Sequence, residues 1–385
     1  MKSTNQKQAI AESGAAPRDL VDVLVSCGVR FATGVPDSLL APLCDQVDDC
    51  RSIQHIIAAN EGSALALGGG HYLATGQRPL IYMQNSGLPN AINPYLSMCH
   101  PSAYAIPSIW VIGWRGEPGV PDEPQHRAIG AATEGLLALL NVPVFMLRSG
   151  DADELDRLEA WMQETEKRTV AVLVSARAVD ADRRAPERLE ARPLKRRELL
   201  EHLVTGLDEE DTIFAGIGHV GRELLAVRGG APTEFAGDLL CVGGMGHASQ
   251  FALGFALARP ERRVWCLDGD GAFTMHMGAC SWLTRHPEQR FIHVLFDNGV
   301  HASVGGQPVC GQAVDFGRIA GALGYQHIER VSTLPAAKAA LDQARARRAP
   351  TFLWCMVDER SSAGLPRPRL ELAARRDIFW SLHSD

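Results

Sequence analysis

The chain lacks a cysteine pattern that would suggest a disulfide framework. None of its nine cysteines belongs to a CxxC pair, and several stand inside apolar runs, as Cys266 does in VWCLDG and Cys355 in FLWCMV. Cysteines placed in this way are typical of buried, reduced thiols. We therefore expect a protein of a reducing compartment, which favours the cytoplasm.

The chain also lacks the features that direct a protein to a membrane or a nucleic acid. Its first 14 residues, MKSTNQKQAIAESG, are polar and contain no apolar segment of the kind found in signal peptides. No apolar run approaches the length that crosses a bilayer. The formal net charge is −7, whereas a nucleic-acid-binding surface needs a basic stripe. We expect neither a membrane nor a nucleic acid as a partner.

Short apolar segments alternate with helical patterns along the 385 residues, which predicts two α/β domains with doubly wound parallel sheets. A stretch rich in Arg, Pro, Asp and Glu separates the two series, so we expect domains at 1–178 and 195–385 and a linker at 179–194. No Rossmann G-x-G-x-x-G fingerprint, tandem repeat or low-complexity segment is present. The expected strands are VRFATGV, IQHIIAA, PLIYMQ, SIWVIGW, VPVFML and TVAVLVS in the first series, and TIFAGI, LLCVGG, RRVWCLDG, RFIHVLF and TFLWCMV in the second.

The most informative motif is LDGDG followed by FDN. Asp270 ends one apolar strand between Gly269 and Gly271, and Asn298 ends the next strand, 28 residues later. This spacing is one βαβ crossover, which brings both side chains to the carboxyl edge of adjacent parallel strands. A carboxylate, an amide oxygen and a nearby carbonyl suit Mg²⁺, while the glycines and the helix starting near Ala272 suit a diphosphate. On its own, a GDG after a strand is more often a simple turn.

At this point the chain resembles the thiamine-diphosphate enzymes, whose GDG…N(N) signature holds Mg²⁺ and the diphosphate of the cofactor. The resemblance implies that Asp270, Asn298 and the main-chain oxygen of Val300 are the metal ligands. The first Asn of the usual pair is Asp297 here, but the ligand matches the second position. The resemblance also implies that the first domain grips the aminopyrimidine and the second the diphosphate.

Glu61 stands where the strand IIAAN gives way to a helix of small residues. The simplest interpretation is a carboxylate that caps this helix. In the thiamine-diphosphate family, a Glu at this position bonds N1′ of the aminopyrimidine and thereby activates the cofactor, which requires a poorly solvated carboxyl. With the downstream motif present, we favour the catalytic role.

Met245, in GGMGHASQ, occupies the position where the family places a bulky apolar side chain under the bent cofactor. A core Met before a glycine turn is the alternative in isolation. We interpret Gly244 and Gly246 as allowing a close approach to a ring. The expected cofactor-binding residues are Glu61, Gly244, Met245, Gly269, Asp270, Gly271, Ala272, Asn298 and Val300.

Four further segments, GVPDSLLAPL, YMQNSGLPNAINP, IGWRGEPGVPDEPQH and NGVHASVGGQP, are similar to the phosphonopyruvate decarboxylase group, and the related sulfopyruvate decarboxylases share much of this pattern. The resemblance spans almost the whole chain. It implies decarboxylation of 3-phosphonopyruvate to phosphonoacetaldehyde and CO₂, with the cofactor performing the difficult step.

Two residues are candidate proton donors. Asp37, in GVPDS, matches a position at which related decarboxylases carry an acid facing the reacting carbon, although the phosphonate group often has a smaller residue there. His126, in EPQHR, resembles the second His of the histidine pair of pyruvate decarboxylases, with Gln125 in place of the first. Taken alone, either residue is more often a helix cap or a loop histidine with a hydrogen-bond partner.

A phosphonate group also needs an anion pocket. Arg115, in GWRGEPG, offers a bidentate donor, and the glycines around it suggest a loop that moves or packs tightly. Residues 303–307, SVGGQ, have the composition of a backbone nest, or of a plain turn. An interdomain salt bridge is the alternative for Arg115. The predicted substrate-binding residues are Ser38, Gln84, Asn85, Arg115, His301, Ser303 and Gln307.

Several alternatives stay open at this stage. A sulfopyruvate decarboxylase uses the same chemistry, a carboligase would join the activated substrate to a second carbonyl, and a non-catalytic thiamine-binding protein would not need Glu61, Asp270 and Asn298 together. Because the family pairs its two half-sites across chains, the resemblance implies a homodimer or larger homo-oligomer that acts on an anionic 2-oxo acid.

Overall fold

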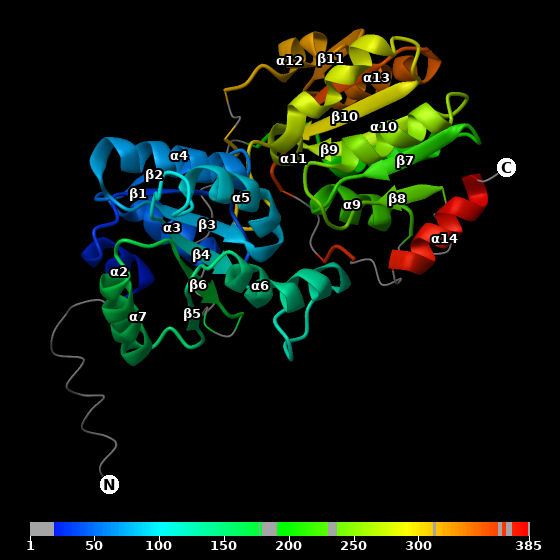
Figure 1. Cartoon of the computed structure of the whole chain (residues 1–385). Helices are drawn as coiled ribbons and strands as arrows, with labels where there is room; N and C mark the ends of the chain where they lie inside the picture. The colour runs from blue at the N-terminus through cyan, green and yellow to red at the C-terminus, as the bar shows by residue number, and fades with distance from the viewer. Residues whose placement is uncertain are drawn as a thin grey trace.

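The structure is a computed structural model that describes residues 19–176, 178, 191–229, 237–310, 313–360, 364–366 and 372–383. These residues form two α/β domains that lie side by side (Figure 1). The first 14 residues and most of the expected linker lie outside the described residues. The described end of that linker runs along the second domain, because the Arg192 amide donates to Asp358 and Leu194 is fully buried in the second core.

The first domain is built on six parallel strands in the order β2-β1-β3-β4-β6-β5. These strands are β1 (Phe31–Gly34), β2 (Gln54–Ile57), β3 (Leu80–Gln84), β4 (Ile109–Gly113), β5 (Val144–Leu147) and β6 (Val170–Val174). The helices are α2 (Leu20–Ser26), α3 (Ala41–Asp49), α4 (Glu61–Thr75), α5 (Leu88–Pro94), α6 (Arg127–Leu139) and α7 (Ala152–Glu164), with short helical turns η1 (Asn85–Gly87), η2 (Tyr95–Cys99) and η3 (Pro124–His126).

The second domain repeats this topology. Its six parallel strands have the order β11-β12-β10-β9-β7-β8. Read from β8, with β7 to β12 counted from one to six, this is the order of the first sheet. The strands are β7 (Asp211–Ala215), β8 (Asp238–Leu240), β9 (Arg263–Gly269), β10 (Phe291–Asp297), β11 (His327–Val331) and β12 (Thr351–Met356). The helices are α8 (Arg196–Thr205), α9 (His219–Val227), α10 (Ala248–Ala258), α11 (Asp270–His276), α12 (Phe316–Ala322), α13 (Leu334–Ala346) and α14 (Leu372–His383), with the helical turn η5 (Met277–Arg285).

Each sheet is buried on both faces, as an all-parallel sheet requires. One apolar cluster covers each face of each sheet, and the central strands β4, β6 and β7 are buried at every residue. This burial explains why the strands are near-continuous apolar runs in the sequence. It confirms the predicted fold class.

Every expected strand is present, and one strand was missed. β11 lies at the edge of the second sheet, and its sequence HIERV leaves Glu329 half-buried and Arg330 exposed. An edge strand of this kind shows no apolar run, so the pattern that identified the other strands is lacking.

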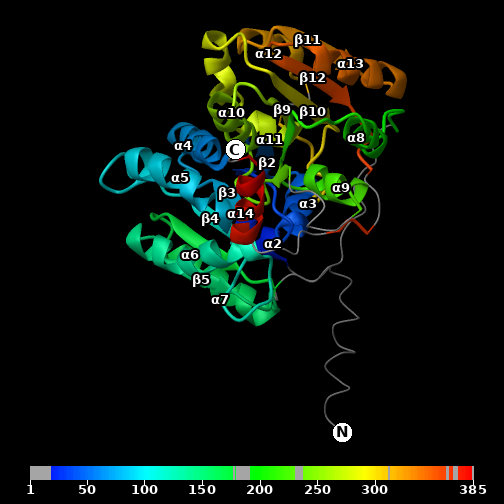
Figure 2. The same cartoon turned by 90° about the vertical axis from the view of Figure 1, so that its right-hand side faces the viewer.

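The two domains contact each other through helices that pack on their sheets. α4 of the first domain lies near α11 of the second in both views (Figures 1 and 2). There, Asn60 Nδ2 donates to the Met275 carbonyl at 3.2 Å. Among the described helices, none has both the length and the apolar character needed to cross a membrane.

Candidate active site

The predicted metal ligands come together at the carboxyl edge of the second sheet. Asp270 is the first residue of α11, directly after β9, and Asn298 directly follows the adjacent strand β10. The two side chains and Val300 line one cavity of about 80 Å³. The spacing between Asp270 and Asn298 therefore brings the two side chains together, as the sequence predicts.

The Asp270 carboxylate is held by the backbone around it. Its Oδ1 accepts from the Gly271 amide at 2.8 Å and its Oδ2 accepts from the Gly299 amide at 2.7 Å. Burial, and then the negative charge of Asp297, raise the pKa of Asp270 to about 7. A divalent cation would offset both effects, because its charge compensates for lost hydration and for the neighbouring carboxylate.

Met245 and the start of α11 share the same cavity. A side chain at Gly271 would collide with the His301 ring and touch the Met245 methyl group. Gly271 therefore allows the His301 ring to lie against the first turn of α11. Burial lowers the pKa of His301 to about 4, so this ring is neutral near pH 7.

The cavity includes two residues that sequence reasoning missed, Arg196 and His219. Arg196 makes a buried ion pair with Glu223 at 2.9 Å, and His219 begins α9 after Gly218, whose φ is +87°. Burial, and then the nearby Arg196 and Arg222, lower the pKa of His219 to about 4. The signal in the sequence is GIGHVGRE after β7, which matters because β7 is the sheet neighbour of β9.

In the first domain, Glu61 lies at the first position of α4 and does not cap it. Asn60 is the N-cap, and its Oδ1 accepts from the Ser63 amide at 2.9 Å. Glu61 is 5% exposed, accepts from Asn90 Nδ2 at 2.9 Å, and lies so close to Gly87 that a side chain there would collide with it. Burial raises the pKa of Glu61. The capping interpretation is therefore wrong, and the carboxyl has the poorly solvated environment that proton transfer needs.

Arg115, Asp122 and His126 form one connected network. Asp122 accepts from Arg115 Nε at 2.9 Å and Nη2 at 2.6 Å, and pairs with His126 Nδ1 at 3.0 Å. Burial alone would raise the pKa of Asp122, but the hydrogen bonds from Arg115 and His126 lower it far below its ordinary value. Asp122 therefore stays ionised and holds the Arg115 and His126 side chains in place.

Asp37 lies next to this network. It is 1% exposed, its Oδ2 accepts from the Leu39 amide at 3.0 Å, and its Oδ1 has no hydrogen-bond partner among the described residues. Burial raises the pKa of Asp37, and the charge of Arg115 opposes this effect. A buried carboxyl with a free oxygen is suited to holding a proton.

A cleft of about 240 Å³ lies between the domains. From the first domain it is lined by Ser38, Gln84, Arg115, Glu123, Pro124, Gln125 and His126, and from the second by Gly216, Ile217, Gly218, His219, Gly221, Arg222, Leu240, Cys241, Val242, Ser303, Val304 and Leu372. This cleft is continuous with the cavity that contains Asp270 and Asn298, because both are lined by Ile217, His219 and Ser303.

Comparisons with known proteins agree with this arrangement. The model of the thiamine pyrophosphate enzyme N-terminal TPP binding domain matches residues 16–133, and that of the C-terminal TPP binding domain matches residues 228–355. A phosphonopyruvate decarboxylase of Streptomyces viridochromogenes is 34% identical over 95% of this chain and 94% of its own. One of Streptomyces hygroscopicus is 32% identical over 92% and 90%.

The chain belongs to the phosphonopyruvate decarboxylase family of thiamine pyrophosphate enzymes. A sulfopyruvate decarboxylase subunit beta of Methanothermobacter thermautotrophicus is also similar, at 33% identity over 41% of this chain and 80% of its own. Thiamine diphosphate with Mg²⁺ is therefore the cofactor of this decarboxylase family member, and the cavity at Asp270 and Asn298 has the oxygen donors that Mg²⁺ needs.

The two glycines that we interpreted as allowing a ring to approach are also needed by the backbone of this turn. Gly244 and Gly246 have φ angles of +63° and +84°, a region that residues with a Cβ rarely adopt. A side chain at Gly246 would also collide with His276 and Met275, whereas the space around Gly244 is open. The turn that presents Met245 thus requires both glycines for its backbone.

The predicted backbone nest at 303–307 is not formed. The amides of Val304, Gly305 and Gly306 all donate inward to the His301 carbonyl, at 3.1–3.2 Å. The plain turn is the correct interpretation for these amides. Within the loop, Ser303 still lines the cleft.

Two of the predicted substrate-binding residues have other partners. Asn85 is fully buried, and its amide group bonds the main chain of Arg115 and the Thr133 hydroxyl. Gln307 Nε2 donates to Asp45 at 3.2 Å, which joins the two domains. Asn85 therefore holds the Arg115 loop, and Gln307 lies at a domain contact.

The loop that carries Arg115 packs tightly. Gly116 has a φ of +68°, and a side chain there would collide with the His126 carbonyl. A side chain at Gly130 would in turn collide with the Gly116 carbonyl. Of the two possibilities for this glycine-rich loop, the structure has the closely packed one. Arg115 pairs with Asp122 of its own domain, which does not fit an interdomain salt bridge.

Proposed function

We propose that this enzyme decarboxylates 3-phosphonopyruvate to phosphonoacetaldehyde and CO₂ with thiamine diphosphate and Mg²⁺. The observation that carries the proposal is the similarity to two phosphonopyruvate decarboxylases along almost the whole of all three chains. The cleft between the domains supports it, since carboxyl, imidazole and guanidinium groups line it beside the metal cavity.

The cofactor would be held by both domains. Asp270, Asn298 and the Val300 carbonyl would bind Mg²⁺, while the first turn of α11, from Gly269 to Ala272, would receive the diphosphate at its amides. Met245, presented by its glycine turn, would support the bent cofactor from below. When bound, the cofactor supplies the electron sink for loss of CO₂.

The chain's own groups would then orient the substrate and move protons. Glu61 would exchange a proton with the aminopyrimidine ring, for which its raised pKa is suited. Asp37 or His126 would deliver the proton that replaces CO₂ on the product. Arg115 and Ser38, joined by a hydrogen bond of 3.0 Å, would face the anionic end of the substrate.

Assays on two substrates test the proposal. The holoenzyme with thiamine diphosphate and Mg²⁺ is given phosphonopyruvate or sulfopyruvate, and products are followed by ³¹P and ¹H NMR. We expect phosphonoacetaldehyde to form, with a kcat/KM well above that for sulfopyruvate. The reverse preference would make the enzyme a sulfopyruvate decarboxylase, and products with a new C–C bond would make it a carboligase.

We also propose a homodimer or larger homo-oligomer. Apolar side chains are exposed on α4 (Leu67, Leu73), on η2 (Leu96) and on α10 (Phe251, Leu257). Several of these side chains on helices of both domains favour burial in an interface. In the structure, one chain forms the cleft from its own two domains, so whether the half-sites pair within or between chains needs its own experiment.

A further inference from the structure

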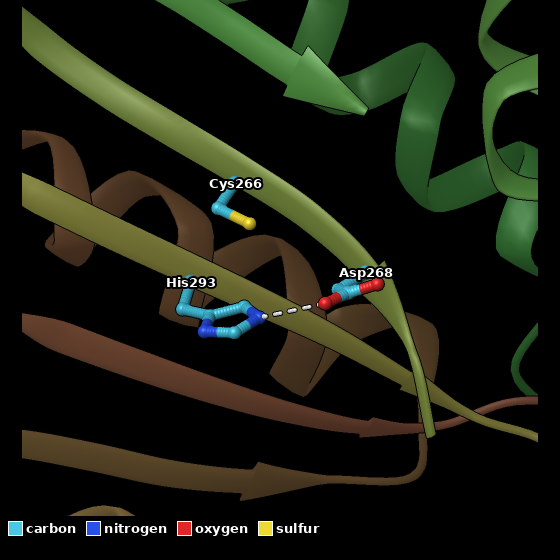
Figure 3. Close-up of side chains that lie close together, drawn as sticks. All are labelled: Cys266, Asp268 and His293. Atoms are coloured by element: carbon cyan, nitrogen blue, oxygen red, sulfur yellow. Dashed lines mark ion pairs between the residues drawn. The ribbon is translucent and has the colours of Figure 1, made fainter. Parts of the chain in front are cut away.

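A second group of metal-ligating side chains lies inside the second domain, apart from the cavity that contains Asp270. Cys266 and Asp268 are on β9 and His293 is on the neighbouring strand β10 (Figure 3). Cys266 pairs directly with His293 in the parallel register, and Asp268 is two residues further along β9. All three side chains therefore point to the same face of the sheet.

This cluster is buried and contains polar atoms without partners. Cys266 and His293 are fully buried and Asp268 is 1% exposed. One potential ligand atom from each residue lies within 4.8 Å of those of the other two. Among the described residues, His293 Nε2 and Asp268 Oδ2 have no hydrogen-bond partner, although they face each other at 3.7 Å. Buried polar atoms without a partner are costly, which indicates that something else occupies the space between them.

The hydrogen bond of the other ring nitrogen of His293 indicates which kind of group fits between these atoms. His293 Nδ1 is 2.8 Å from the Tyr325 hydroxyl. If Nδ1 donates this bond, Nε2 carries a lone pair and faces an anionic oxygen and a sulfur. A histidine whose second nitrogen is fixed by a hydrogen bond is the usual arrangement at a metal centre.

We infer that Cys266, Asp268 and His293 bind one divalent transition metal ion of the Zn²⁺ type. Thiolate, imidazole and carboxylate are the ligands that zinc takes in proteins. Ligand atoms around a tetrahedral zinc lie roughly 3.3–3.8 Å apart, so small side-chain movements would close this set. A fourth ligand would come from water or from Cys280, which is fully buried and close to His293.

The ion would fasten β9 to β10 just below the active site. Asp270 follows Asp268 by two residues. Asn298 directly follows β10, the strand that contains His293. The two strands that present the magnesium ligands would thus be cross-linked through their side chains. The role of the ion would be structural, because the cluster does not line the cleft or the cavity described above.

The alternative to a metal ion is a proton on His293 Nε2. Burial lowers the pKa of His293, but Tyr325, Cys266 and Asp268 raise it, and the balance is a raised pKa. A proton on Nε2 would leave a buried His–Asp pair that holds no metal.

Metal analysis of the holoenzyme distinguishes a bound metal ion from a proton. The protein is produced with added ZnCl₂ or CoCl₂, loaded with thiamine diphosphate and Mg²⁺, and dialysed before elemental analysis and visible spectroscopy. We expect about one Zn²⁺ or Co²⁺ per chain, and for Co²⁺ a thiolate-to-metal charge-transfer band that an all-oxygen magnesium site cannot give. A wild-type protein without retained metal or without this band would overturn the inference, whether or not the enzyme decarboxylates phosphonopyruvate.

Variants assign the ligands. Cys266→Ser and His293→Gln should each lose the bound metal, and Cys266→Ser should also lose the band. Cys355→Ser is the matched control, since Cys355 is an equally buried thiol on β12 that packs in the cluster on the opposite face of the sheet. Equal metal content in Cys266→Ser and wild type would contradict the assignment. Circular dichroism checks the fold of each variant, and the wild-type measurement stands even if a variant does not fold.

Discussion

At the scale of single residues, Glu61 shows how burial prepares a carboxyl for proton transfer. It stands at the first position of α4, but Asn60 caps the helix, so the Glu61 side chain is available for another role. Burial raises its pKa, while the hydrogen bond from Asn90 partly opposes that rise. The carboxyl therefore gains and loses a proton closer to neutral pH than an exposed glutamate does.

Replacing Glu61 with Gln should abolish proton exchange and retain the shape of the site. We expect kcat to fall by about 10²–10⁴-fold while the Kd for thiamine diphosphate changes little. Steady-state kinetics and isothermal titration calorimetry measure the two quantities. Glu134→Gln, at an exposed position of α6, is the control and should behave as wild type. Near-normal turnover of Glu61→Gln would remove its assigned role.

Asp37 should reveal itself through the pH dependence of stability. Burial raises its pKa in the folded protein above the unfolded value, so the folded state holds the proton more tightly. Stability is then lost as pH rises from the unfolded pKa through the folded pKa. Asp37→Asn cannot ionise, and we expect its Tm relative to wild type to be higher at pH 8 than at pH 4.

The same substitution should slow turnover by about 10²-fold if Asp37 delivers a proton. Thermal unfolding at the two pH values and steady-state kinetics give both readouts. Asp377→Asn, on the exposed surface of α14, is the control for a general charge effect. A Tm difference that is the same at both pH values would show that Asp37 has no raised pKa.

At the scale of elements, the pairing of β9 with β10 places the proposed magnesium ligands Asp270 and Asn298. Asp270 and Asn298 each stand one residue beyond the end of a strand, where the parallel arrangement brings the strand ends to one edge. Asp270→Ala should weaken thiamine diphosphate binding by roughly 10–100-fold, and removal of Mg²⁺ with a chelator should have the same effect on wild type. Calorimetry at fixed Mg²⁺ measures this, with Asp315→Ala at the cap of α12 as the control. Unchanged affinity would contradict the metal assignment.

The loop between β4 and α6 offers a second prediction at this scale. Gly116→Ala adds a methyl group against the His126 carbonyl and strains a φ of +68°, so it should displace Arg115 and His126. We expect KM to rise by about tenfold or more. Gly119→Ala is matched, because its φ is +81° but the space around it is open, and it should change stability without changing KM. Equal KM values for the two variants would mean that this loop does not position the substrate site.

At the scale of the whole molecule, the active site needs both domains. The proposed proton-transfer groups Glu61, Asp37 and His126 belong to the first, and the proposed magnesium ligands belong to the second. The direct contacts described between them, from Asn60 to Met275 and from Gln307 to Asp45, are single hydrogen bonds of 3.2 Å each. Because these contacts are single hydrogen bonds, we expect the pairing of the two domains to depend also on contacts within an oligomer.

Mixing two inactive variants tests which chains pair their half-sites. Glu61→Gln damages only the first half-site and Asp270→Ala only the second. If sites form between the chains of a dimer, as the family resemblance predicts, one site of each mixed dimer is intact. We then expect about a quarter of wild-type activity after denaturation and joint refolding. Wild type refolded alone is the control, and no recovered activity would place both half-sites in one chain.

Some side-chain arrangements were beyond sequence reasoning. Nothing in GWRGEPGVPDEPQH reveals that Asp122 binds both Arg115 and His126, because that depends on the path of the loop. The amides of SVGGQ look equally available in a nest and in a turn until their acceptor, the His301 carbonyl, is in place. Edge strand β11 was missed because only Val331 of its five residues is buried, so the strand has no apolar run.

The sequence by itself determined the two α/β domains and the meeting of Asp270 with Asn298. Both follow from local rules, since strands buried on two faces must be apolar runs, and the ends of adjacent parallel strands share one edge. Only the tertiary structure decided which donors are already bonded, how the first domain's carboxyls face the second, and that Cys266, Asp268 and His293 share one buried space. These outcomes depend on strand register and loop path, which long-range packing sets and no short motif encodes.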